Sequence, residues 1–192
     1  MPMGLEWLIH NADRRGAEGM FFHVHNESLF DMSAPTVRVV MSLNAQWYEL
    51  MWRGEKTHEF RRRYLSGAPT QWFVYLTAPD SRMCAVIDLD IAIEDTPENI
   101  AQLAERMRPG NGETVLPYLA RDGKELGYAL PIRRVREFEG FSADELDQML
   151  DGSFTAPQGY TLVDRHPAWQ AVCDKLVSTP IVRETTIEGT TP

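Results

Sequence analysis

The sequence predicts an α+β domain in which a small mixed β-barrel carries peripheral helices. Three observations favour this fold class. Short β-branched or alternating segments are interspersed with amphipathic segments, and Gly and Pro separate them. The chain has 192 residues and is 43% apolar, which is enough for one domain with a real core. We expect this domain at residues 37–178, between an N-terminal extension (1–36) that need not be ordered and a C-terminal tail (179–192), because neither end keeps an apolar period.

The domain is expected to open with a strand and a helix. Residues 37–43 form a β-branched, apolar run that is typical of a buried strand. Residues 42–53 have helical spacing, with Trp47 and Leu50 on the apolar face, so Trp47 is expected in the core. Gly54 is expected to end this helix in a conformation with positive φ.

A strand is expected next at residues 57–64. Successive side chains alternate between the two faces of a strand, so Glu59 and Arg61 should share a face. In the following strand, 70–77, Trp72 is expected in the core, whereas Tyr75 is the better candidate to touch a ligand.

The second half of the chain continues the mixture of strands and helices. Its strands are expected at 85–94, where apolar and polar residues alternate, and within 126–138. Its helices are expected, from N-caps, first-turn prolines and apolar periods, at 97–107, 113–120, 143–150 and 166–177.

The charge and composition of the chain make some classes of partner unlikely. The net charge of −9 makes duplex DNA an unlikely partner, because that binding depends on many Lys and Arg contacts to phosphates. Residues 37–65 nevertheless carry six basic and three acidic side chains, a basic island that could guide an anionic ligand or a single strand. No apolar run approaches the length of a membrane span, and the first residues do not resemble a signal peptide. We therefore expect a cytoplasmic protein without a membrane partner.

The cysteines and histidines do not suggest a metal site. Cys84 and Cys173 are far apart and are interpreted as two buried thiols. His23 and His25 would lie on one face of a strand, but no third ligand is near them in the sequence. We expect neither a metal nor another cofactor.

Residues 54–61, Gly-Glu-Lys-Thr-His-Glu-Phe-Arg, fit the pattern G-x-K-x-x-E-x-R. Lys56 can offer an ammonium to a phosphate or a base carbonyl, and Glu59 can accept hydrogen bonds from an exocyclic amino group. Arg61 could hold Glu59 in position or contact phosphate. The alternative interpretation is a plain surface pair between Glu59 and Arg61, worth on the order of 0 to 1 kcal/mol.

This pattern resembles the signature of the ASCH family, a branch of the PUA-like β-barrels that handle RNA. The resemblance extends over residues 37–138, because the order of strand, Ser-Leu, helix and glycine before the motif and the strands after it are also similar. It implies a PUA-like barrel whose cleft recognises a nucleoside, nucleotide or short single strand, in which the base could be modified. The residues expected to bind the ligand are Ser42, Lys56, Thr57, Glu59, Arg61 and Tyr75. The expected partners are RNA, single-stranded nucleic acid or a free nucleotide.

Two other function classes stay open. Some ASCH proteins are amidohydrolases of acylated cytidines that use a lysine, a threonine and a glutamate, and others have been proposed to cleave RNA. Lys56 matches that lysine, but Glu59 stands where the threonine is expected, so Lys56 and Glu59 would carry catalysis here if the protein is an enzyme. Thr57 is adjacent but would point differently on a strand. The third class is a protein-interaction domain with a degenerate cleft, which would lack an open, charged cavity.

Overall fold

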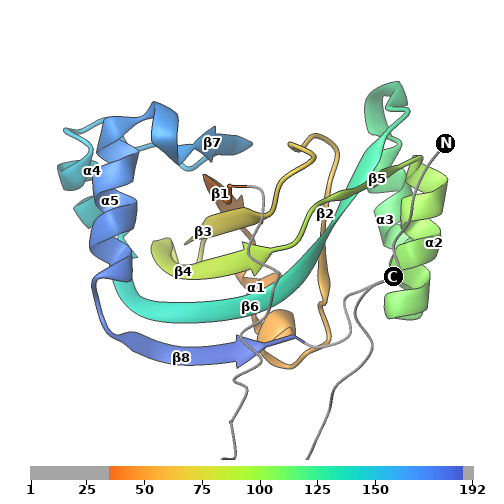
Figure 1. Cartoon of the computed structure of the whole chain (residues 1–192), viewed down its shortest axis with the longest axis horizontal. Helices are drawn as coiled ribbons and strands as arrows, with labels where there is room; N and C mark the ends of the chain where they lie inside the picture. Colours follow the sequence, from red (N-terminus) through yellow and green to blue (C-terminus); the bar gives the residue numbers. More distant parts are fainter. Residues whose placement is uncertain (1–34, 188–192) are drawn as a thin grey trace, which may run out of the picture. The chain divides into compact units, whose positions relative to one another are not determined.

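The computed structural model describes residues 35–187, which form a curled eight-stranded sheet with five α-helices (Figure 1). The strands are β1 (Val37–Leu43), β2 (His58–Arg61), β3 (Thr70–Leu76), β4 (Arg82–Leu89), β5 (Ile93–Asp95), β6 (Gly127–Ser142), β7 (Tyr160–Leu162) and β8 (Ile181–Thr186). The helices are α1 (Ala45–Trp52), α2 (Pro97–Met107), α3 (Asn111–Leu119), α4 (Ala143–Met149) and α5 (Pro167–Val177), with 3-10 turns η1 (Arg121–Gly123) and η2 (Val163–Arg165).

The long strand β6 organises the sheet. Its first residues pair with β2 on one edge and β5 on the other, and its later residues pair with β8 and β4. The sheet continues from β4 through β3 and β1 to β7, and among the described strands only the β1–β3 pairing is parallel. Within residues 35–187 no backbone pairing joins β2 to β1 or β7. The curled sheet is therefore a half-barrel that stays open between β2 and β1, and the expected α+β fold is confirmed.

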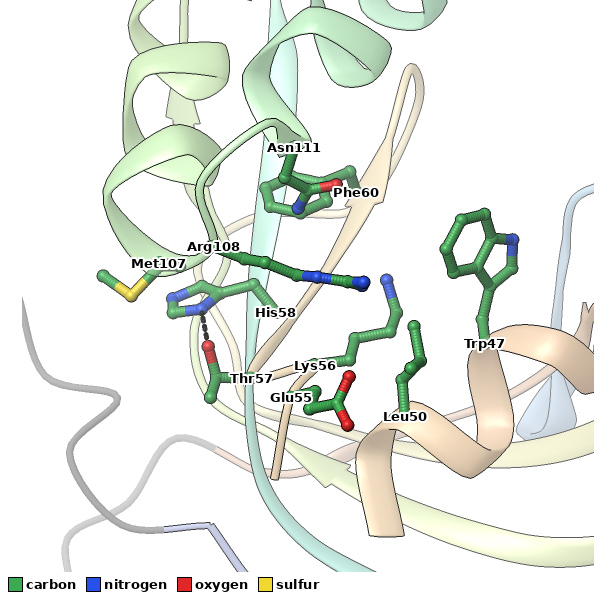
Figure 2. Close-up of a pocket in the computed structure, with 10 residues that line it drawn as sticks. All are labelled: Trp47, Leu50, Glu55, Lys56, Thr57, His58, Phe60, Met107, Arg108 and Asn111. Atoms are coloured by element: carbon green, nitrogen blue, oxygen red, sulfur yellow. Dashed lines mark hydrogen bonds between the residues drawn. The ribbon is translucent and has the colours of Figure 1, made fainter. Parts of the chain in front are cut away.

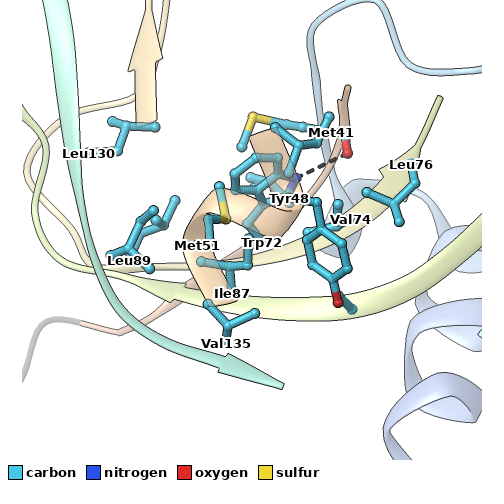
Figure 3. Close-up of a cluster of buried hydrophobic side chains, with 14 of the residues drawn as sticks. Met41, Tyr48, Met51, Trp72, Val74, Leu76, Ile87, Leu89, Leu130 and Val135 are labelled. Carbon is cyan, nitrogen blue, oxygen red and sulfur yellow. Dashed lines mark hydrogen bonds between the residues drawn. The ribbon is translucent and has the colours of Figure 1, made fainter. Parts of the chain in front are cut away.

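Both faces of the sheet are buried. On one face Trp72 packs with Tyr48 and Met51 of α1, and its indole Nε1 donates to the Met41 carbonyl at 3.0 Å (Figure 3). On the other face, Phe73 and Tyr75 pack in a second cluster that includes residues of α4 and α5. A third cluster joins α2 and α3 to β2 and β6. Strand β3 is thus covered on both sides, so its central residues are apolar without alternation.

Most expected elements are present, with shifted ends. The first strand is found at its expected residues, but α1 starts at Ala45 because the Asn44 side chain caps it, and β2 stops at Arg61 rather than at residue 64. Ser142 and Glu145 form the expected capping box of α4. The strand expected at 85–94 is split into β4 and β5, because the chain leaves β4 after Leu89 and returns to β6 only at Ile93.

The expectation of a tail from residue 179 is wrong for residues 181–187. Strand β8 pairs with β6, and Ile187 is buried against the core. Arg183 lies over the Trp52 ring at 4.1 Å and contacts the Glu137 carboxylate at 2.7 Å. Polar and cation–π contacts therefore hold β8, so it shows no apolar period.

The described residues also bear on the remaining expectations. Cys84 and Cys173 are buried and free, as expected. Among residues 35–187 no helix combines the length and the hydrophobicity needed to span a membrane. Residues 1–34, which include His23 and His25 and most of the expected N-terminal extension, lie outside the described residues.

Candidate functional site at the opening of the half-barrel

The turn that places Lys56 is a Schellman motif at the end of α1. Gly54 has φ of 71°, as expected, and its N–H donates to the Met51 carbonyl at 3.0 Å. The N–H groups of Glu55 and Lys56 both donate to the Leu50 carbonyl, at 2.9 and 3.1 Å. The backbone of Lys56 is thus tied to the helix end, immediately before β2.

Lys56, Glu59 and Arg61 converge in a single ionic cluster. Lys56 Nζ lies 3.0 Å from Glu59 Oε2, and Arg61 Nε lies 3.0 Å from Glu59 Oε1. The Arg61 Nε–H is not aimed at that oxygen well enough for a hydrogen bond, so this contact is ionic. Glu59 is only 7% exposed, so the cluster is not the surface pair that was the alternative interpretation.

Arg61 also spans the opening of the half-barrel. Its Nη2 donates to the carbonyl of Ser42 at 3.0 Å, and its guanidinium lies 5.4 Å from the centre of the Trp72 ring. The side chain therefore links β2 to the end of β1 where no backbone pairing does.

The two cations control the protonation of Glu59. Burial alone would raise the pKa of this carboxyl, but the charges of Lys56 and Arg61 outweigh burial and hold its pKa below the ordinary value. Glu59 is therefore a carboxylate at neutral pH, able to accept hydrogen bonds but not to donate a proton.

A cavity of about 450 Å³ lies beside this cluster. Its volume falls in the range of small-molecule sites, ~300 to 1,000 Å³. Three parts of the chain line it: the end of β1 with the start of α1, then Lys56 with β2, and finally α3. The lining residues, in that order, are Ser42, Leu43, Asn44 and Trp47, then Lys56, Glu59, Phe60 and Arg61, and then Asn111, Thr114, Val115 and Tyr118.

The α3 wall of the cavity is held by α2. The Glu105 carboxylate accepts hydrogen bonds from the N–H groups of Gly110 and Gly112 at 2.9 and 3.0 Å, which fixes the start of α3. A Cβ on Gly112 would lie 2.8 Å from the Ala101 carbonyl oxygen, so only glycine lets the two helices approach this closely. This contact sets the position of Asn111, Thr114 and Tyr118 at the cavity.

Two aromatic rings flank the Lys56 ammonium. Figure 2 shows the Lys56 side chain extending between Trp47 and Phe60, whose ring centres lie 5.7 and 5.5 Å from Nζ. Trp47 is 40% exposed, so its expected place in the core is wrong. The core face of α1 is formed by Tyr48 and Met51, which leaves Trp47 and Leu50 beside the site.

A small adjoining pocket holds Thr57 and His58, whose hydroxyl and Nδ1 share a 2.9 Å hydrogen bond (Figure 2). Thr57 lines this pocket and not the larger cavity. His58 is buried, and burial together with the nearby Lys56 charge lowers its pKa to about 4. The imidazole is therefore neutral at physiological pH.

The structure brings four of the six expected ligand residues to the larger cavity: Ser42, Lys56, Glu59 and Arg61. The Ser42 hydroxyl already donates to the Pro157 carbonyl at 2.8 Å. Tyr75 is not brought there. It lies on the opposite face of β3 from Trp72 and packs edge-on against Phe154 at 5.1 Å.

Sequence reasoning missed the residues of α3. Asn111, Thr114 and Tyr118 are far from the motif in the sequence, and only the packing of α3 against β2 brings them to the cavity. The one available signal was the glycine-rich loop before α3, which permits the close helix contact but does not reveal its location.

A half-barrel whose opening carries a G-x-K-x-x-E-x-R segment beside a cavity is the arrangement expected from the resemblance to the ASCH fold. Comparison with solved structures supports this assignment. The chain is similar to the ASCH protein of Zymomonas mobilis, with a TM-score of 0.58 and 23% identity over 73% of this chain and 94% of that one. Two single-substitution variants of that protein give TM-scores of 0.59 and 0.56, each at 22% identity over 73% of this chain and over 94% and 96% of theirs. Comparisons with protein-family models and with curated proteins gave no match. The chain therefore has an ASCH-like fold.

Proposed function

We propose that the protein is an ASCH-type RNA-binding module whose cavity recognises a nucleotide, either free or within a short single strand. One observation carries this proposal: a single open cavity contains two cations, a buried carboxylate and exposed aromatic rings. A nucleotide needs all three, because its phosphate requires cations, its base edge requires hydrogen-bonding groups, and its base face can stack on aromatic rings.

The buried carboxylate favours a base over a phosphate alone. Glu59 neutralises part of the charge of Lys56 and Arg61, so it would weaken a site that bound only phosphate. An ionised carboxylate can instead accept a hydrogen bond from an exocyclic amino group, such as that of cytosine. Trp47 and Tyr118, each 40% exposed, are the rings available for stacking.

The open, charged cavity also argues against a protein-interaction domain with a degenerate cleft. A protein-interaction domain with a degenerate cleft has no use for a buried Lys-Glu-Arg cluster, whose desolvation costs several kcal/mol per ion unless the geometry repays it. The cluster supports a ligand site.

Calorimetric titration with the four nucleoside monophosphates tests the proposal. Lys56→Ala should weaken all of them by about tenfold or more, because a hydrogen bond to a charged group contributes ~1.5 to 3 kcal/mol. The matched control is Lys175→Ala, since Lys175 also lies over an aromatic ring, that of Phe141 at 5.3 Å, but does not line the cavity. The absence of saturable binding both by these monophosphates and by short single strands, or an equal loss in both variants, would refute the proposal.

A second candidate is a hydrolase of modified nucleosides or of RNA, which the Thr57–His58 hydrogen bond favours. A hydroxyl beside a neutral imidazole is the arrangement of an activated nucleophile, although the low pKa of His58 makes it a weak base. Mass spectrometry of N-acylated cytidines and of short RNA after incubation with the protein tests this candidate. Turnover that Thr57→Val abolishes would support it, and absence of turnover would remove it.

A further inference from the structure

We infer that the cavity takes a nucleotide that belongs to a single strand, and that the neighbouring nucleotides lie in a basic groove past Arg62, Arg63 and Lys124. This inference rests on the proposed function and makes it more specific, because it names an oligonucleotide rather than a free nucleotide as the ligand. We call the hollows lined by these three residues the flanking groove.

The flanking groove adjoins the cavity. A hollow of about 390 Å³ shares Arg61 and Tyr118 with the cavity. A further hollow of about 520 Å³ shares Arg62, Arg63 and Lys124 with the first. Because each hollow shares lining residues with the next, a chain that leaves the cavity past Arg61 and Tyr118 comes directly to the groove.

The charges of the flanking groove suit a phosphate backbone. Arg62 pairs with Asp122 at 3.2 Å, so the carboxylate partly neutralises its charge. Its guanidinium also lies 5.3 Å from the centre of the Tyr118 ring. Among the residues that the structure describes, Arg63 and Lys124 form no ion pair. Glu125 opposes them, but the groove still has a positive balance in a protein of net charge −9. Phosphates are thus attracted to this groove and repelled by most of the surface.

Exposed tyrosines border the same path. Tyr118 faces both the cavity and the first hollow, and Tyr160, also 40% exposed, borders the second hollow, where it packs edge-on against Tyr64 at 5.9 Å. A cationic groove with exposed aromatic rings is the usual design for binding single strands, whose unstacked bases can lie on the rings. Bases inside a duplex cannot stack in this way, so the aromatic rings favour a single strand over a duplex.

A comparison of ligand lengths tests the inference. We would measure affinities of homopolymeric ribonucleotides of each base with lengths of one, three and five nucleotides. The pentamer should bind at least tenfold more tightly than the monomer of its base. The double variant Arg63→Ala, Lys124→Ala should remove this gain and leave the affinity of the monomer unchanged. Its slope of log affinity against log salt for the pentamer should fall by ~1.4, because each phosphate neutralised on a single strand contributes ~0.7 to that slope.

Two controls complete the design. Arg165→Ala removes an exposed arginine of η2 that lines neither the cavity nor the groove, so it should change no affinity. Thermal unfolding of each variant checks that the fold is intact.

If the pentamer binds no more tightly than the monomer, or if the double variant keeps the gain, the inference is overturned while the proposed function stands. If Lys56→Ala leaves every affinity unchanged, or no ligand of any length binds, the proposed function fails and the inference fails with it.

Discussion

At the residue scale, the main feature is that Glu59 lies between two cations with little exposure. A carboxylate in this place has two effects, since it holds Lys56 and Arg61 in position and it reduces their attraction for anions. A site built to bind phosphate alone has no reason to include it. The cluster therefore fits a site that reads a base edge as well as a phosphate.

Glu59→Gln should separate these two roles. Because an amide donates as well as accepts, the variant should change which of the four nucleoside monophosphates binds best. Inorganic phosphate should bind at least as tightly as to the unaltered protein, because the competing negative charge is gone. Calorimetry with all five ligands measures both effects. If the order of affinities for the four bases is unchanged, Glu59 does not recognise the base and the site binds only the phosphate.

His58 gives a prediction for the pH dependence of stability. Its folded-state pKa of about 4 lies below the ordinary value of 6.5, so its contribution to stability is present above pH 6.5 and is lost as the pH falls toward 4. At pH 5 His58 is protonated in the unfolded chain but mostly neutral in the folded protein. This difference lowers the free energy of unfolding by about 2 kcal/mol relative to pH 8. His58→Asn cannot titrate in this range, so its unfolding free energy should fall less between these two pH values. Chemical denaturation at pH 8 and pH 5 measures the difference, and parallel losses in both proteins would contradict the assignment.

The sequence predicts the ionic cluster because alternation along one strand puts Glu59 and Arg61 on the same face. Trp47 and Tyr75 were placed wrongly because their surroundings depend on tertiary packing. On a helix as short as α1, rotation by one residue exchanges the core and cavity faces, and a strand covered on both sides gives no alternation from which to identify the face of Tyr75.

At the scale of single elements, the turn after α1 determines where Lys56 lies. Gly54→Val should lower the unfolding free energy by about 1 kcal/mol or more, because a β-branched residue resists the φ of 71° that the Schellman motif needs. Gly159→Val is the matched control, since a Cβ there meets open space and the backbone has no positive φ. Denaturant unfolding of both variants tests this, and equal stabilities would remove the strain argument for the turn.

Strand β8 should be required for stability. Truncation after Val177 removes its pairing with β6, the buried Ile187 and the contact of Arg183 with Trp52, which together should cost on the order of 2 kcal/mol or more. Truncation after residue 187 keeps all three interactions and serves as the comparison. A shorter protein that unfolds as cooperatively and at the same denaturant concentration as the longer one would contradict the role of β8.

Local chemistry explains which elements are predictable. The N-caps of α2 and α4 act within a few residues, so Thr96 and the capping box of Ser142 locate the helix starts in the sequence. The pairing of β8 is a long-range interaction whose stabilising groups are charged, so composition alone makes the segment resemble a tail.

At the scale of the whole described domain, the fold and the site share one cause. The order of strands and helices can be predicted from the sequence. This order specifies a sheet that curls along β6. The opening between β2 and β1 and the α3 wall arise only when distant segments pack, so the cavity itself could not be predicted from the sequence. The cavity lies where the half-barrel is open, and there the Arg61 side chain links β2 to the end of β1 in place of backbone pairing.

A crystal structure of the protein with a saturating concentration of its preferred nucleoside monophosphate tests most directly whether the cavity binds a nucleotide. We predict that the nucleotide occupies the cavity of about 450 Å³, with the base edge within hydrogen-bond distance of the Glu59 carboxylate and the phosphate facing Lys56 or Arg61. A nucleotide bound elsewhere on the protein, while the cavity holds only solvent, would contradict it.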